Sequence, residues 1–219
     1  MHKSIRRSAL LVPVIAALAA HPAEAQQAER AEEVQHRNRC RLAAQVMQTG
    51  HPRPQIDWAR GYISICDHEG PAVLASEWRV VEGGTAEIYY LVGSSRRIRD
   101  ARIYDALRST AADRSRTDVV RVGAMLALAA YVDPRNAIRF SDLRPPRGGP
   151  TRIPLVPNWT TAGGQSQGSV PIQGAVAAEV KALFSEIARS RTMEPIEIWY
   201  AAAVLAKRVE ADIRYGRAR

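Results

Sequence analysis

The sequence contains few of the residues and motifs from which an activity is usually inferred. Only two cysteines occur in 219 residues, and phenylalanine, tyrosine and tryptophan together make up 6% of the chain. We find no Gly-x-Ser-x-Gly nucleophile motif, no Walker phosphate loop, no Rossmann glycine fingerprint and no histidine pair spaced as in zinc proteases. These absences exclude the best-known hydrolase, nucleotide-binding and zinc-protease motifs, so we assign no catalytic residue and expect no cofactor.

Long hydrophobic runs are also absent. A transmembrane helix needs about 20 apolar residues, and the run near the N-terminus, residues 9–20, is shorter than that. This run follows three basic residues and precedes the small-residue triplet 23–25, which is the layout of a cleavable secretory signal. We therefore predict cleavage after Ala25, export to the periplasm or the outside of the cell, and no transmembrane span.

The chain carries an excess of positive charge, with 31 lysines and arginines, 22 acidic residues and a formal net charge of +9. The basic residues are spread along the chain among the acidic ones, and no aromatic and basic recognition motif accompanies them. Such a distribution is typical of an arginine-rich soluble protein, and alternatively it favours attraction to an anionic surface. We do not expect a nucleic-acid partner.

Regularly spaced apolar residues, interrupted by glycine and proline, predict a series of short helices. The expected helices cover about residues 28–48, 54–66, 71–81, 86–92, 99–112, 117–131, 176–187 and 196–209. Residues 144–174 contain six prolines and six glycines, too many for a regular helix, and we interpret them as a long loop or insertion. The predicted organisation is all-α, with a signal peptide at 1–25, a helical-hairpin domain at 26–143 and a C-terminal hairpin at 175–219 packed on the same domain.

Similar stretches open the second helix of several predicted pairs. Their acidic residues are Asp57, Glu87, Asp118 and Glu197, which lie 30, 31 and 79 residues apart. The first two intervals suit a helical-hairpin repeat, and the third would hold the same unit plus the insertion. Residues 117–132, with an acid, valines, an arginine and a small residue before an apolar run, resemble the second helix of a HEAT repeat. This resemblance implies hairpins stacked as a solenoid, and the alternative is an irregular helical bundle.

The two cysteines, Cys40 and Cys66, both follow the predicted cleavage site. An even cysteine count in an exported protein favours a disulfide, which would join the first two helices and stabilise the fold by roughly 3–4 kcal/mol. A zinc site is the alternative, because His36 lies four residues before Cys40 and His68 lies two residues after Cys66. Two buried, unpaired thiols are the third possibility.

Aromatic and arginine side chains are the candidate contacts for a partner. Aromatic residues at helix openings are typical of core packing, but in a stack of hairpins some of them would line a shared surface. An arginine cluster between two predicted helices is typical of a solvated turn, and alternatively it docks an acidic partner. The candidate binding residues are Trp58, Trp78, Tyr89, Arg96, Arg97, Arg99 and Trp199.

These observations predict a secreted or periplasmic helical-repeat protein that binds a protein partner in the cell envelope and catalyses no reaction. Two other functions stay open. An envelope hydrolase acting on a glycan or anionic substrate would need a pair of carboxylates, which the sequence alone does not locate. A periplasmic metal-binding protein would use the four histidine and cysteine ligands named above.

Overall fold

The computed structural model describes residues 12–49, 52–96, 98–133, 136, 140–143, 145 and 174–215. Within these residues the regular structure is helical and no strand occurs, which confirms the predicted all-α fold. The elements are α1 (Val12–Thr49), α2 (Arg53–Ile63), α3 (Glu69–Val80), α4 (Thr85–Ser95), α5 (Ala101–Ala112), α6 (Asp118–Val132), η2 (Phe140–Leu143), α7 (Gly174–Arg189) and α8 (Ile196–Arg214). Nearly all of the predicted loop at 144–174 lies outside the described residues.

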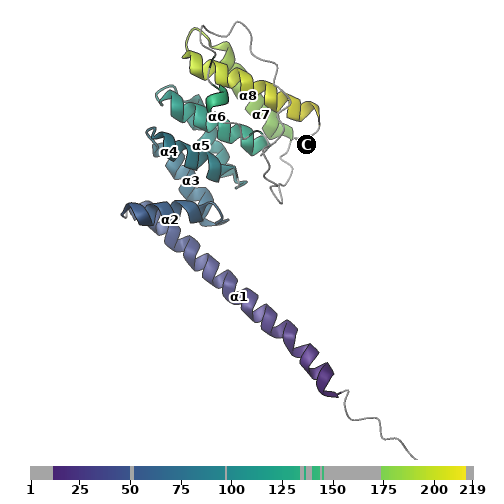
Figure 1. Ribbon diagram of the computed structural model, residues 1–219. Helices are drawn as coiled ribbons and strands as arrows, with labels where there is room; N and C mark the ends of the chain where they lie inside the picture. The colour runs from purple at the N-terminus through teal and green to yellow at the C-terminus, as the bar shows by residue number, and fades with distance from the viewer. Residues whose placement is uncertain are drawn as a thin grey trace, which may run out of the picture.

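The helices pack as successive pairs, α1 with α2, α3 with α4, α5 with α6 and α7 with α8. The first helices of neighbouring pairs contact one another from α1 to α3, α5 and α7, and the second helices do so from α4 to α6 and α8. Figure 1 shows the pairs following one another along the molecule. This is the packing of stacked helical hairpins, in which each pair buries its apolar surface against its neighbours.

Helix α6 lies at the centre of the core and contacts α4, α5, α7 and α8. Its residues from Val120 to Val132 are all buried. Small side chains allow this close packing, because Ala124, Ala127 and Ala129 leave room for the neighbouring helices and have no exposed surface. Alanine and leucine also favour the helical backbone itself, so the same residues form the helix and bury it.

Three arginines have a structural role that the composition alone does not reveal. Arg116 donates hydrogen bonds to backbone carbonyls at the end of α3, Arg121 to one at the end of α5 and Arg99 to one at the end of α6. The last carbonyls of a helix have no partner within the helix and carry partial negative charge, so a guanidinium stabilises them. Part of the positive charge of the chain therefore serves to hold the ends of helices against neighbouring segments.

Helix α1 extends away from the rest of the molecule (Figure 1). Residues 25–39 are exposed at every position, and burial begins only at Cys40, Ala43 and Val46, where the helix meets α2 and α3. In the described part of the chain, none of the helices has both the length and the hydrophobicity of a membrane span. The signal peptide predicted at 1–25 stays a prediction, since residues 1–11 lie outside the described ones.

Candidate functional site

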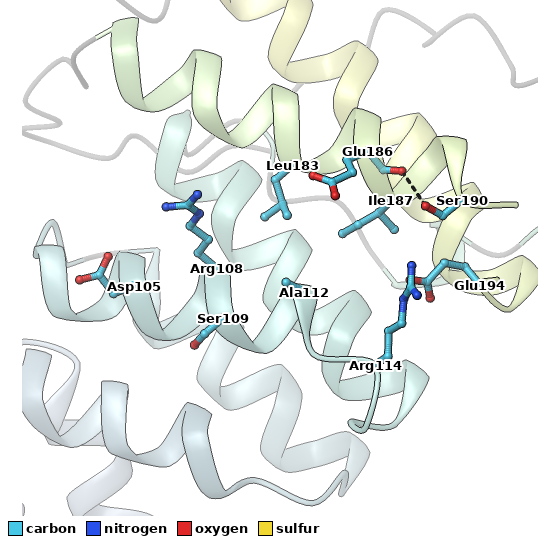
Figure 2. Close-up of a pocket in the computed structure, with 10 residues that line it drawn as sticks. All are labelled: Asp105, Arg108, Ser109, Ala112, Arg114, Leu183, Glu186, Ile187, Ser190 and Glu194. Atoms are coloured by element: carbon cyan, nitrogen blue, oxygen red, sulfur yellow. Dashed lines mark hydrogen bonds and ion pairs between the residues drawn. The ribbon is translucent and has the colours of Figure 1, made fainter.

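A groove of about 510 Å³ lies between α5 and α7, the first helices of the last two hairpins (Figure 2). From α5 come Asp105, Arg108, Ser109 and Ala112, from α7 come Leu183, Glu186 and Ile187, and Ser190 follows directly after α7. In both helices the lining positions recur at intervals of three, four and seven residues, which places them on a single face of each helix. The groove is therefore formed by two facing helical stripes.

The two walls carry charged side chains that the fold leaves unpaired. Arg108 on α5 and Glu186 on α7 are both exposed. Neither side chain forms an ion pair or hydrogen bond with another residue that the structure describes. Leu183 lies between these two side chains and Ile187 lies on the far side of Glu186, and both provide apolar surface (Figure 2). The groove therefore places charge of both signs beside apolar surface.

One end of the groove is built around Glu194, which precedes α8. Arg121 donates to both of its carboxylate oxygens, at 2.5 and 3.0 Å, and the Nε of Arg114 donates to Oε1 at 3.0 Å. The side chains of Arg121 and Glu194 are each only 2% exposed. A carboxylate paired in this bidentate way is held firmly in its ionised form.

The surroundings of Glu194 also exclude one chemical role. Hydrogen bonds from Arg121, and secondarily from Arg114, lower the pKa of the Glu194 carboxyl below its ordinary value. A general acid at neutral pH needs a raised pKa instead. Glu194 is therefore a structural carboxylate and is unsuited to the protonating role that the predicted hydrolase would require.

The aromatic residues predicted as partner contacts lie in different environments. Trp58 on α2 is 41% exposed and stacks against Tyr62, with ring centroids 5.7 Å apart. Tyr89 on α4 is also exposed. Trp78, in contrast, has no exposed surface, and its indole N–H donates to the hydroxyl of Ser95 at 2.8 Å. Trp78 is therefore a core residue and presents no surface to a partner.

The remaining predicted contacts are also dispersed. Arg96 is exposed, whereas Arg99 is half-buried and lies over the ring of Tyr131 at 4.9 Å from its centroid. Burial lowers the pKa of Arg99 from its ordinary value. Trp199 is half-buried beneath another arginine, and Arg97 lies outside the described residues. These residues belong to different elements from the groove.

The predicted disulfide is present. Cys40 of α1 and Cys66, just after α2, are bonded to each other with a Cα–Cα distance of 5.6 Å. His36 lies beside this bond, with Nε2 3.6 Å from the sulfur of Cys40, while His68 is exposed. With the two cysteines joined in this disulfide, no group of three or more His, Cys, Asp and Glu residues able to hold a metal ion occurs among the described residues. The four-ligand zinc site predicted as an alternative is therefore not formed in this disulfide-bonded state.

Sequence reasoning missed the groove residues Arg108 and Glu186. Their spacing on α5 and α7 was a usable signal, because charged residues there alternate with the apolar positions of an amphipathic helix. Whether the two stripes face each other depends on how each helix is rotated about its axis in the stack. The periodicity of the sequence does not specify this rotation.

The stacked hairpins are compatible with a helical-repeat fold. Comparisons with protein-family models, with curated proteins and with solved structures found no match to this chain. The resemblance of residues 117–132 to a HEAT repeat therefore has no support from a family model.

Proposed function

We propose that this protein is an exported helical-repeat protein of the HEAT-like kind, which binds a partner protein through the groove between α5 and α7. One observation carries the proposal: Arg108 and Glu186 stand on opposite walls without an ion-pair partner among the described residues, beside the apolar Leu183 and Ile187. Apolar surface with polar groups around it is the usual anatomy of a protein interface. Unpaired charges of both signs select a partner with complementary charges.

The dimensions of the groove favour an extended segment of the partner. Each lining stripe covers seven residues of helix, which is about 10 Å at 1.5 Å per residue. An extended chain advances about 3.3 Å per residue, so three or four residues of the partner would fill this length. The segment that fits best carries an acidic side chain opposite Arg108, a basic one opposite Glu186 and an apolar one between them.

Two features support the export part of the proposal. The N-terminal residues have the layout of a secretory signal, and Cys40 and Cys66 form a disulfide. Disulfides form and persist mainly in oxidising compartments such as the periplasm and the exterior of the cell. A partner in the cell envelope is consistent with both features.

The experiment that tests the proposal is site-specific photo-crosslinking in the host cell. A photoreactive amino acid replaces Ser109, which lines the groove, and in a control strain it replaces Ser76, which is exposed on α3. We expect one discrete cross-linked polypeptide from position 109 and none from position 76. Mass spectrometry then identifies the partner, so that its affinity can be measured with purified proteins.

Charge reversal distinguishes groove binding from general electrostatic attraction. Arg108→Glu should weaken binding of the identified partner at least about tenfold, the size expected for losing one close charge pair in an interface. Arg189→Glu makes the same charge change on an exposed residue of α7 that does not line the groove, and it should leave the affinity unchanged. Equal weakening by the two variants, or no cross-link from position 109, would show that the groove is not the binding site.

A further inference from the structure

Three metal-ligating side chains meet where α1 packs against α2. His36 and Cys40 lie one turn apart on α1, and Cys66 follows α2. The Nε2 atom of His36 is 3.6 Å from the sulfur of Cys40, which is itself bonded to the sulfur of Cys66. In the oxidised protein the sulfurs are poor metal ligands, because a disulfide sulfur carries no thiolate charge. Reduction would turn this cluster into two thiols beside an imidazole.

The spacing of these donors suits tetrahedral zinc. Zinc binds cysteine sulfur at about 2.3 Å and histidine nitrogen at about 2.0–2.1 Å. At a tetrahedral angle those bond lengths place the nitrogen and the sulfur roughly 3.5 Å apart, close to the 3.6 Å found between His36 and Cys40. Two zinc-bound sulfurs lie roughly 3.8 Å apart by the same geometry, about the distance at which two unbonded sulfurs come into contact. Only a small separation of Cys40 and Cys66 is therefore required.

The imidazole is also held in the orientation that a metal ligand needs. The hydroxyl of Tyr62, on α2, is 2.9 Å from Nδ1 of His36. When Nδ1 carries the proton and donates it to this hydroxyl, the lone pair of Nε2 points toward Cys40. Histidine ligands of metals commonly have their second ring nitrogen bound in this way, which sets the tautomer and the ring direction. His36 is exposed, so a metal ion can enter from its side of the buried sulfurs.

We propose that the reduced protein binds one Zn²⁺ through Cys40, Cys66 and His36, with the fourth position open to water. A dithiol reductant supplies two electrons and two protons, the Cys40–Cys66 bond breaks to give two thiols, and the reductant leaves as its own disulfide. Zinc then displaces the two thiol protons and binds both thiolates. The metal replaces the disulfide as the link between α1 and α2. This inference does not depend on the groove or on its partner.

Zinc binding to the full chain tests the proposal. The protein is reduced without oxygen by a phosphine, which competes little for zinc, and is titrated with Zn²⁺ against a chromogenic chelator. We expect one zinc per reduced chain, none per oxidised chain, and a zinc-dependent rise in melting temperature for the reduced chain only. His36→Ala should weaken zinc binding at least about 100-fold, and Tyr62→Phe about 10-fold through the lost orienting hydrogen bond.

His68→Ala is the matched control, because His68 also neighbours Cys66 in sequence but is exposed and stands at the N-cap of α3. The His68→Ala variant should bind zinc with the same affinity as the unchanged chain. Circular dichroism follows the helix content throughout, so that loss of helix on reduction is seen directly. The proposal is overturned if the reduced chain, whatever its helix content, binds no zinc, if the oxidised chain binds it equally, or if His68→Ala loses as much affinity as His36→Ala.

Discussion

The first hairpin and the last two hairpins of this protein are held in place by different kinds of interaction. Helix α1 is exposed over residues 25–39 and meets its neighbours only near its end, where the Cys40–Cys66 disulfide ties it to α2. Helix α6 instead is surrounded by α4, α5, α7 and α8 and needs no covalent link. A terminal hairpin has a neighbour on one side only. The comparison shows a covalent bond at the hairpin whose first helix is largely exposed over its described side chains.

The same contrast holds for two ion pairs that connect successive hairpins. Arg60 of α2 binds Glu87 of α4 at 2.8 Å, and these side chains are 27% and 33% exposed. Arg121 of α6 binds Glu194 at 2.5 Å, and both side chains are 2% exposed. The first pair is half-buried, so solvent screens it more than the second pair and it contributes less. The second pair is desolvated, so loss of one partner leaves an uncompensated buried charge.

The largest effect is expected from breaking the buried ion pair. Arg121→Ala should lower the free energy of unfolding by about 3–5 kcal/mol, because Glu194 stays buried without its main partner. Arg60→Ala, at the half-buried pair, should lower the free energy of unfolding by less, about 1 kcal/mol. Urea denaturation of both variants measures the difference. Similar losses would mean that the two pairs do not differ in the way their burial indicates.

A matched pair of leucine truncations tests the difference in packing. Leu128 in α6 has no exposed surface, whereas Leu42 in α1 is 51% exposed. Leu128→Ala should destabilise the protein by about 2–5 kcal/mol through lost burial and a cavity. Leu42→Ala should change the stability by no more than about 0.5 kcal/mol. Thermal and urea denaturation check both values, and a large loss for Leu42→Ala would indicate that α1 is packed more extensively than its exposure implies.

Removal of the disulfide tests whether the first hairpin and the core around α6 differ in stability. The double variant Cys40→Ala, Cys66→Ala should lose about 2–4 kcal/mol, the usual contribution of closing a loop of this length. Amide hydrogen exchange should accelerate in α1 and α2 while α6 keeps its protection, because the cross-link acts only on the first hairpin. Uniform acceleration along the chain would instead show that the first hairpin and the core unfold together.

The pH dependence of stability is a further test of the buried ion pair. Because the pKa of Glu194 is lowered in the folded state by Arg121 and Arg114, its contribution is present above the ordinary pKa of 4.5 and is lost as the pH falls through the folded value. Glu194→Gln should therefore be less stable than the unchanged protein at neutral pH, with a difference that shrinks on acidification below pH 4.5. Urea denaturation across this range measures it. Glu197→Gln, on an exposed residue, is the control, and a difference for Glu194→Gln that stays constant with pH would contradict the assignment.

The positions of the helices could largely be predicted from the sequence. The helix expected at 117–131 is found at Asp118–Val132, since its apolar spacing and flanking breakers are local signals. Helix α4 was predicted to end near Val92 but continues to Ser95. The reason is tertiary, because Ser95 is buried and its hydroxyl accepts the indole hydrogen bond of Trp78.

The candidate binding residues were harder to predict, because residue type does not reveal burial. Trp78 and Trp58 both stand on predicted amphipathic helices, and only packing places the first in the core and leaves the second exposed. Arg99 was predicted to belong to a solvated turn or to a docking site for an acidic partner, and its guanidinium instead binds a backbone carbonyl at the end of α6.

The sequence by itself determined the all-α class and the approximate helix boundaries, because each depends on local spacing. It favoured a disulfide between the two cysteines but left a zinc site and free thiols open. Only the tertiary structure decided that Arg121 meets Glu194, 73 residues away, and that the charged stripes of α5 and α7 face each other across a groove. Such contacts between residues distant in sequence depend on how each helix is rotated and placed in the stack. That placement is set by the summed packing of many side chains and leaves no local pattern in the sequence.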